Sequence, residues 1–514
     1  MDSFMFGRRK IYTDADEITK ENIIPILQTA FWIHVRNRIE IFNLIGYEKG
    51  KQDIRNREKE IRSDINVKVA DNIASEITEF KLGYEFGSPI TYVQRARYCQ
   101  HNKKGKEVNQ EADDRIAYLN EMMEEEGKAA KDQELARYFK ICGVGYRGVF
   151  PKEVVTGTSV FDLVTLHPAF TFIIYKNDMY KKPIMAVSYI EKQNGERVFG
   201  CYTKDKYFKV GGILDVGEAT PGNANVRTPY VIEEPNTIGK IPIIEYINDY
   251  DRMGCFEKFI SEMEAVNIVT SDRVNDLSQH VQAILWLHNC IVDEQQKGKL
   301  QEGGLLVTKS TGDGKEPKVQ YVQSTLNQSE VQTLATSMID RILQKANVPG
   351  RQEQSGGSTG SAMNLSNGWQ AAETAAKKQE IIFTASEMQT LDVVLEIIHR
   401  SNEVDESLHD LELSDILPKF SRNKTYDLAT KCNSLSTLLK SGVYGLRAFE
   451  HVGLFTDPQQ TWNDSKDMVE AIQKSQIKED KADSAPGDNE GDSKKEMPDA
   501  SNQPSKVSMV DEGV

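Results

Sequence analysis

The chain has 514 residues, of which 39% are hydrophobic and 27% charged, and its formal net charge is −15. This composition fits a soluble globular protein with a polar surface, and the length allows about three domains. The negative charge argues against a protein that wraps nucleic acid by neutralising many phosphates, although an acidic wall past which DNA slides remains compatible with it.

Cysteine spacing and hydropathy exclude further classes. The six cysteines are scattered, and no pair has the C-x-x-C spacing of a zinc site. A reducing cytoplasm is therefore the simpler environment. No segment approaches the roughly 18 apolar residues that span a bilayer, and the first residues are too short and wrongly ordered for a signal peptide. We expect no membrane contact, metal or cofactor.

The N-terminal part is predicted to be helical. Apolar residues recur at helical spacing over residues 20–45, 66–82 and 116–141. In the second of these segments the apolar stripe consists of Val69, Ile73, Ile77 and Phe80.

The periodicity changes at Gly143. Strand-like segments at 170–175, 184–190, 198–202 and 226–232 are separated by Asn-Asp, Asn-Gly and Pro-Gly turn signals. No segment of helical length separates these strands, so an antiparallel β region over about 143–247 is favoured over βαβ units.

Helical periodicity returns at Gly254. A seam with a 3.5-residue period fits equally a core helix and a contact between subunits. Its members are Ile260, Met263, Asn267, Thr270, Val274 and Leu277. A small α/β insertion is predicted over 286–325, so that two long helices carry a small tip between them.

A second long helix is predicted to begin at Asn327. Glu330 follows at the spacing of a capping box. Val331, Leu334, Met338 and Ile342 share one face of this helix. The helix is predicted to stop at Asn347-Val-Pro349, because the residue before proline avoids the α region.

A polar, glycine-rich loop follows from Pro349 to Gly360. It is either an ordinary surface connection, which is the commonest case, or a functional loop. A phosphate-binding loop is the disfavoured alternative, because the lysine that such a loop requires is missing. A longer helix then runs towards Arg400, and Gly368 is predicted to kink it. Beyond it, short helices are predicted at 425–439, 445–451 and 461–472, and a disordered tail from about Ser475.

Several local motifs, in this order, resemble the portal proteins of tailed bacteriophages. The matching segments are Tyr47-Glu-Lys-Gly-Lys-Gln-Asp-Ile54, Gly83-Tyr-Glu-Phe-Gly-Ser-Pro-Ile-Thr-Tyr92, Gly239-Lys-Ile-Pro-Ile-Ile-Glu-Tyr-Ile-Asn248 and Asn347-Val-Pro349. The similarity spans roughly residues 40–400. The region beyond 410 departs from any pattern we can name.

The resemblance implies an α+β, portal-like subunit with a named order of parts. These are a wing (1–253, helical and then β-rich from about 143), stem helices (254–285 and 327–348), a small α/β clip (286–326), a channel loop (349–361), a long wing helix (362–407), a helical crown (408–474) and a disordered acidic tail (475–514).

The resemblance also implies a function. About twelve copies would form a ring at one capsid vertex of the virion, after assembly in the host cytoplasm, and double-stranded DNA would be packaged and ejected through it. Implied partners are the terminase large subunit, the head–tail adaptor, and the major capsid and scaffolding proteins. The channel-loop residues implied to meet DNA are Pro349, Gly350, Arg351, Gln352, Gly356, Gly357, Ser358, Thr359 and Gly360. Arg351 is the one cation of this loop, and it fits a solvated surface arginine equally well.

Two other classes stay open. A packaging-associated ATPase would need a phosphate loop, and a nuclease would need grouped carboxylates. The acidic runs Asp113-Asp114, Glu124-Glu-Glu126 and Glu233-Glu234 fit solvated charge instead. The seam with a 3.5-residue period, taken alone, would also be compatible with a non-viral ring or scaffold protein. We expect no catalytic residues.

Overall fold

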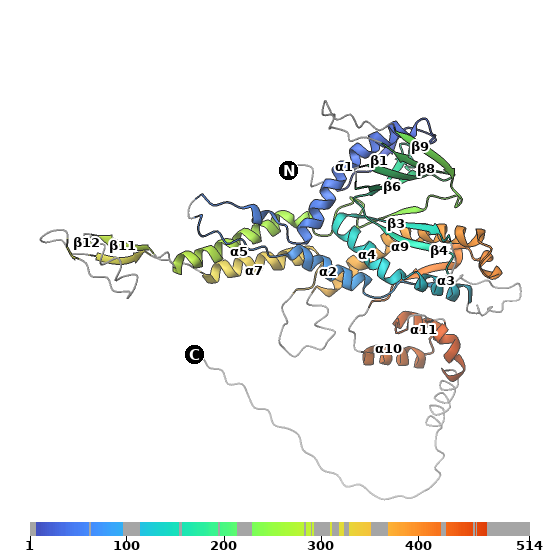
Figure 1. The fold of residues 1–514 in the computed structure, drawn as a ribbon. Coiled ribbons are helices and arrows are strands. Elements are labelled where there is room, and N and C mark those ends of the chain that lie inside the picture. Colours follow the sequence, from blue (N-terminus) through green and yellow to red (C-terminus); the bar gives the residue numbers. More distant parts are fainter. Residues whose placement is uncertain are drawn as a thin grey trace, which may run out of the picture. The chain divides into compact units, whose positions relative to one another are not determined.

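The structure is a computed structural model. It describes residues 7–60, 63–95, 114–153, 157–193, 196–212, 229–281, 284–288, 290–291, 309–310, 318–322, 328–350, 368–422, 428–455, 458 and 460–469. The chain divides into two compact units, Met1–Thr430 and Lys431–Val514, and each is described by itself (Figure 1).

The largest sheet of the first unit has six strands in the order β1-β5-β6-β7-β8-β9. Their bounds are β1 Ile11–Thr13, β5 Thr171–Lys176, β6 Pro183–Glu191, β7 Arg197–Tyr202, β8 Lys206–Gly211 and β9 Tyr230–Pro235. Only β1 and β5 pair in parallel, and the other pairs are antiparallel. The predicted antiparallel β region is therefore confirmed.

The two faces of this sheet are covered by different elements. Helix α1 (Ile23–Glu48) lies on one face, where Leu27 and Phe31 pack with Phe172 and Phe199. The other face packs on a three-stranded sheet of order β10-β3-β4 through residues that include Ile173. Those strands are β3 Val144–Pro151, β4 Phe161–Leu166 and β10 Ile243–Ile247.

Helix α9 (Trp369–Arg400) packs on the three-stranded sheet and shares a hydrophobic core with helices from the N-terminal half. These are α2 Ile73–Phe86, α3 Asp114–Glu125 and α4 Lys128–Cys142. The main hydrophobic core lies between them and is centred on Phe139 and Phe383. Strand β15 (Ile416–Lys419) pairs with β2 (Thr91–Gln94). Short 3-10 helices are η1 Asp53–Asn56, η2 Glu257–Phe259, η3 Glu406–Asp410 and η4 Leu413–Asp415.

Two predicted N-terminal helices differ from the structure. The segment predicted as 116–141 is two helices, because Gly127 adopts a left-handed φ of 63° between α3 and α4. The helix predicted over 66–82 begins only at Ile73. Residues 67–71 instead form hydrogen bonds with a distant helix, described below, and this tertiary contact overrides the helical pattern.

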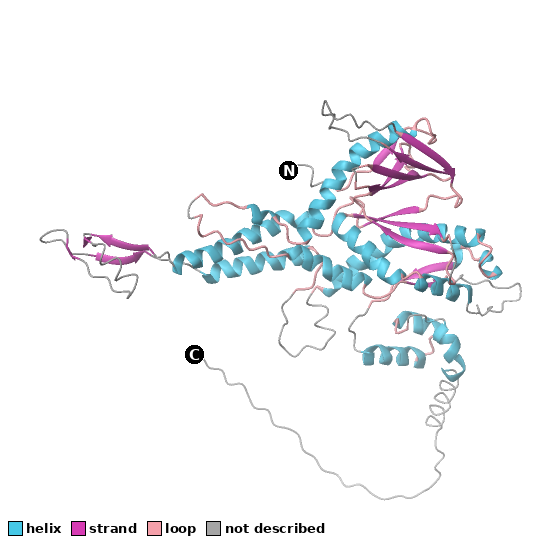
Figure 2. Ribbon diagram, viewed as in Figure 1, coloured by secondary structure: helices cyan, strands magenta, loops and turns pink. Residues whose placement is uncertain are grey.

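Helices α5 (Ile260–Val281) and α7 (Gln328–Lys345) pack side by side and lead to small strand pairs (Figure 2). Strand β11 (Ile284–His288) pairs with β14 (Lys318–Val322). Strand β12 (Cys290–Ile291) pairs with β13 (Lys309–Ser310). Two long helices with a small tip between them were predicted, and the described residues of the tip are strands.

The second unit contains helical segments. Helix α10 (Leu428–Lys440) leads into it, and α11 (Gly445–Val452) follows. Trp462 packs against Tyr444 and Phe449. The predicted tail, 475–514, lies outside the described residues. Within the part of the chain that the structure describes, no helix is both long enough and apolar enough to cross a membrane.

Candidate functional site: the α7–α9 junction and the anchor of α9

Helix α7 ends in a Schellman motif. Asn347 adopts a left-handed φ of 57°, and its N–H donates to the Gln344 carbonyl at 3.1 Å. The N–H of Val348 donates to the Leu343 carbonyl at 2.9 Å, and both of these side chains are buried together. The predicted helix end is confirmed, and the cap explains it together with Pro349.

We expect Asn347→Ala to lower the free energy of unfolding by about 1 kcal/mol, because alanine has a Cβ but no short polar side chain to support a left-handed φ. Asn347→Gly is the matched control and should be near neutral. Urea denaturation of the full chain measures both. Equal losses for the two variants would contradict the role of the backbone conformation.

The two described ends of the loop segment lie next to one another. A Cβ built on Gly368 would be 3.7 Å from the Cα of Pro349. Gly368 has a φ of 83°, so it precedes α9 and the predicted kink inside a helix is wrong. Pro349 is half-buried and Gly350 is exposed. The other residues predicted to meet DNA, Arg351, Gln352, Gly356, Gly357, Ser358, Thr359 and Gly360, lie outside the described residues.

The first turns of α9 are fixed to α2. The Trp369 ring centroid lies 5.9 Å from that of Phe80 and 5.7 Å from that of Tyr84. The Tyr84 hydroxyl donates to Glu373 Oε2 at 2.7 Å, and Arg422 donates to the other oxygen of the same carboxylate at 2.7 Å. The structure therefore holds the start of α9 firmly where the loop segment ends.

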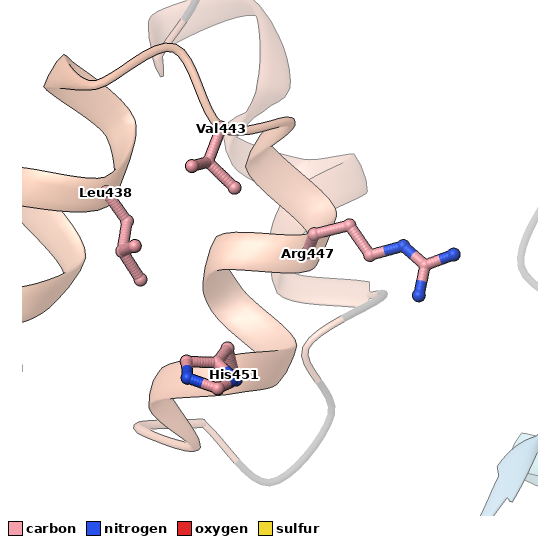
Figure 3. A pocket seen from close by; sticks show the side chains of 4 residues that line it. All are labelled: Leu438, Val443, Arg447 and His451. Atoms are coloured by element: carbon pink, nitrogen blue, oxygen red, sulfur yellow. The ribbon is translucent and has the colours of Figure 1, made fainter.

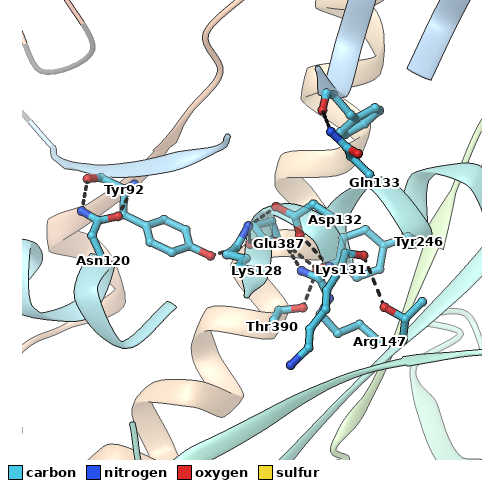
Figure 4. A network of polar contacts seen from close by, with 12 residues as sticks. Tyr92, Asn120, Lys128, Lys131, Asp132, Gln133, Arg147, Tyr246, Glu387 and Thr390 are labelled. Atoms are coloured by element: carbon cyan, nitrogen blue, oxygen red, sulfur yellow. Dashed lines mark hydrogen bonds and ion pairs between the residues drawn. The ribbon is translucent and has the colours of Figure 1, made fainter. Parts of the chain in front are cut away.

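Farther along α9, a buried network of four charged groups anchors the helix (Figure 4). Lys128 Nζ lies 2.5 Å from Asp132 Oδ2 and 3.1 Å from Glu387 Oε1. Arg147 Nη2 lies 2.6 Å from Asp132 Oδ1, and its Nη1 lies 3.6 Å from Glu387 Oε2. Two cations and two anions balance, which is what permits their burial. The network joins α4 and β3 to α9.

Two tyrosines complete the coordination of Glu387. The hydroxyls of Tyr92 and Tyr246 donate to its two oxygens at 2.5 and 2.6 Å. Burial alone would raise the pKa of Glu387, but the charges of Lys128 and Arg147 and the two hydroxyls lower this pKa to about 2. Burial and the Glu387 charge raise the pKa of both tyrosines. Glu387 is therefore ionised at neutral pH, and both tyrosines are protonated.

Sequence reasoning missed this network. Its members come from β2, α4, β3, β10 and α9, with no shared spacing along the chain. One signal was available: Glu387 falls on the same helical face as Phe383 and Leu391, which are buried. A carboxylate on an apolar helical face requires a buried partner.

The predicted α5 seam is partly buried in the subunit. Met263 and Asn267 are buried, whereas Ile260, Thr270 and Val274 are half-buried. Leu277 is 55% exposed. The face that α5 buries is rotated relative to the predicted seam, and it adds the residues Val266, Ser271 and Asn275. A contact between subunits along this seam stays a prediction.

Polar side chains of α5 bind the backbone of residues 67–71, and we call this set the polar ladder. Asn267 Oδ1 accepts from the N–H of Asp71 at 2.8 Å. Ser271 Oγ accepts from the N–H of Val69 at 2.9 Å and donates to its carbonyl at 3.3 Å.

The third rung of the ladder has the same form. Asn275 accepts from the N–H of Val67 at 2.6 Å and donates to its carbonyl at 3.1 Å. Each rung therefore pairs every fourth residue of α5 with every second residue of the segment.

We expect Ser271→Ala to destabilise the protein by about 1–3 kcal/mol, because it removes the partner of the Val69 N–H. Amide hydrogen exchange of residues 67–71 should accelerate by the corresponding factor. Ser278→Ala is the matched control, since the Ser278 hydroxyl donates to its own helix at Val274. Unchanged exchange at Val69 in Ser271→Ala would contradict the ladder.

The second unit has a groove of about 510 Å³ between α10 and α11 (Figure 3). Leu438, Val443 and His451 line it with Arg447, whose guanidinium points away from the other three side chains. Within the described parts of the chain, no group of three or more His, Cys, Asp or Glu side chains could hold a metal ion. The groove is thus a mainly apolar surface with no catalytic grouping that we recognise.

Comparison with known families gives a match over most of the chain. Residues 31–483 match the family model described as phage portal protein, SPP1 Gp6-like. No curated protein matches the chain. The family match begins within α1 and extends past α11, so it covers every described strand except β1, together with the paired helices, the α7–α9 junction and the charged anchor. The chain therefore belongs to the SPP1 Gp6-like family of phage portal proteins.

Proposed function

We propose that this protein is the channel through which double-stranded DNA enters and leaves a phage capsid. Membership of the portal family implies a multimeric ring at the capsid vertex of the virion. The observation that carries the proposal is the α7–α9 junction. The loop segment leaves and rejoins the subunit at adjacent points, between the paired helices and a helix fixed by a buried charge network.

In this proposal about twelve subunits form the ring. Helices α5 and α7 form the stem, and the strand pairs beyond them form a clip on which the terminase large subunit and later the head–tail adaptor dock. Residues 349–361 form the channel loop, which meets DNA through Arg351 and small residues. The wing meets the capsid and scaffolding proteins. The protein has no enzymatic activity of its own.

The anchor of α9 supports the mechanical part of this role. A loop that shifts as DNA passes needs a support that does not shift with it. Glu387 and Thr390 on α9 are fully buried, and the Tyr246 hydroxyl contacts both. Trp369 holds the first turn against α2. In this proposal, a shift of the channel loop as DNA passes would therefore not be transmitted to the subunit core.

Single-particle electron microscopy of the purified full chain tests the ring. End-on views should show a closed ring of about twelve subunits with an axial hole. If the chain alone stays monomeric, it is co-expressed with capsid and scaffolding proteins. Failure to form rings in both conditions would overturn the proposal.

A packaging assay then tests the loop. Arg351→Ala, and separately a chain lacking Gly356–Gly360, should form rings but package less DNA. Lys209→Ala, an exposed cation on β8, is the control and should package normally. The same preparations should hydrolyse no ATP and cleave no DNA with Mg²⁺. An activity that persists in pure rings would favour an enzyme instead.

A further inference from the structure

We propose that residues 1–6 of this chain, which lie outside the described residues, bind in a groove beside α9 of their own subunit. The inference concerns a single subunit and goes beyond the proposed channel, because it does not depend on ring assembly. It joins the first residues of the chain to the helix that follows the loop segment.

The groove has a volume of about 770 Å³ and lies between α9, β10 and β5. Isoleucine side chains from all three elements line it, among them Ile173, Ile243 and Ile381. Ile381 is 70% exposed, and Tyr250, which also lines the groove, is 75% exposed. Exposed apolar side chains gathered around an apolar groove indicate that another segment covers it.

Two hydrogen bonds show how the groove runs along α9. The Gln379 side chain donates to the Ile247 carbonyl at 3.2 Å, and Lys240 Nζ donates to the Asp392 carbonyl at 3.1 Å. Helix α9 is therefore antiparallel to β10, and the groove has one end near Ile381 and the other near Asp392. Between these two residues the helix advances about 17 Å.

The described chain begins at one end of this groove. Gly7 lies against the backbone that follows Tyr250, since a Cβ built on Gly7 would be 1.9 Å from the Asp251 carbonyl oxygen. Gly7 has a left-handed φ of 69°, and the next residue, Arg8, is buried. The point at which residues 1–6 join the described chain is therefore fixed beside the groove.

The order of side chains in residues 1–6 matches the groove. In an extended chain alternate side chains share one face, so Phe6, Phe4 and Asp2 point the same way. Five residues of extended chain advance about 17 Å. When the segment follows α9 back from Gly7, its two aromatic rings therefore meet the apolar part of the groove, and Asp2 reaches the far end.

An exposed cation lies at that far end. The Asn236 side-chain amide donates to the carbonyl oxygens of Lys204 and Lys240 at 3.1 and 2.8 Å, which brings these two lysines together. Lys204 lines the groove and is exposed, whereas the Lys240 ammonium lies 2.9 Å from Asp392 Oδ1. Lys204 is therefore the partner for the Asp2 carboxylate. Apolar walls with a cation at one end fit an apolar segment with an acid at one end.

A pair of cysteines tests the contact. Phe4→Cys with Ala385→Cys should form an intramolecular disulfide on oxidation, because Ala385 is exposed and lies midway along the α9 side of the groove. The full chain also carries Cys99→Ser, Cys290→Ser and Cys432→Ser, so that fewer native thiols compete. A non-reducing gel and mass spectrometry of the tryptic peptides identify the link.

The matched control pair is Phe4→Cys with Lys258→Cys. Lys258 is exposed and its Nζ lies 3.8 Å from the Asp251 carboxylate, so it is near Gly7 but outside the groove. The disulfide yield of the control pair should be at least fivefold lower. Equal yields would overturn the inference, because a segment that moves freely would reach both positions. Cross-linked dimers or longer products would overturn it as well, because the segment would then enter the groove of a neighbouring copy.

Charge exchange gives a second measurement. Lys204→Glu should lower the yield of the groove disulfide at least threefold, and the addition of Asp2→Lys should restore it. Lys209→Glu is the control, since Lys209 is an exposed cation on β8 outside the groove, and it should leave the yield unchanged. No effect of Lys204→Glu would overturn the placement of Asp2. An intramolecular disulfide in a chain that never forms rings would support this inference and count against the proposed function.

Discussion

Glu387→Gln should lower the free energy of unfolding by about 3–5 kcal/mol, because it leaves two buried cations with a single anion. Lys128 and Arg147 would then share Asp132, and all of these side chains are at most 4% exposed. A urea denaturation midpoint of the full chain measures the loss. The glutamine keeps the size of the side chain, so the change reports on charge more than on packing.

Glu396→Gln is the matched control, because it lies on the same helix. Glu396 bridges Lys240 and Arg400, and these pairs are open to solvent. Exposed ion pairs contribute about 0–1 kcal/mol. Equal losses for the two variants would mean that the buried network does not anchor α9.

The same carboxylate gives a pH dependence with a defined sign. In the folded chain the pKa of Glu387 is about 2, below its usual value of 4.5. A lowered folded pKa gives stabilisation that is complete above the unfolded pKa and is lost as the pH falls through the folded one. We therefore expect stability to fall between about pH 4.5 and 2, and Glu387→Gln to reduce this dependence. Parallel acid titrations of the two chains would contradict the assignment.

Phe383→Ala is the second large effect that we expect. The Phe383 ring lies at the centre of an aromatic cluster, with centroids 5.0 Å from Tyr246, 5.3 Å from Phe86 and 5.7 Å from Phe420. Truncating a buried phenylalanine costs about 3–5 kcal/mol through lost burial and the cavity that remains. Because the cluster holds α9 to three other segments, the loss should also increase amide exchange along this helix.

Two further substitutions make this test specific. Phe383→Leu keeps most of the buried volume and should cost clearly less than the alanine variant. Lys377→Ala lies on an exposed part of the same helix and should change stability by no more than about 0.5 kcal/mol. A Phe383→Ala chain as stable as Lys377→Ala would show that the cluster carries little of the packing energy.

Local patterns predicted much of the fold. The helical stripe of α1, the turn signals between β5, β6 and β7, and the end of α7 at Asn347 are each determined by residues close in sequence. Residues 67–71 are an exception. Val69 continues a helical stripe in the sequence, but this segment is not helical in the structure. Their backbone groups bind α5, and Val69 and Ser271 are separated by 202 positions in the sequence. No local pattern contains that contact.

The candidate site likewise has one part that the sequence predicted and one part that it did not. The glycine-rich segment was recognisable from composition, and its two anchoring ends are described. The buried network was not predictable, because each of five elements supplies one or two of its residues. From the sequence alone, charged residues scattered among helices and strands are expected to lie at the surface. Only the folded structure shows that Arg147 and Glu387 lie close together.

The polar ladder limits its own length. Four residues of helix advance about 6.0 Å, whereas two residues of extended chain advance about 6.6 Å. The α5 residue and the segment residue of each successive rung are therefore displaced along the contact by about a further 0.6 Å, and at the third rung this displacement is about 1.2 Å. Hydrogen bonds span only about 0.5 Å of distance variation, so side-chain flexibility must absorb this drift. We therefore expect that each further Asn or Ser at the same spacing would add less to the contact than the three present rungs. The mismatch of the two periodicities therefore works against a longer contact on one side, and on the other side the extended segment ends where α2 begins at Ile73.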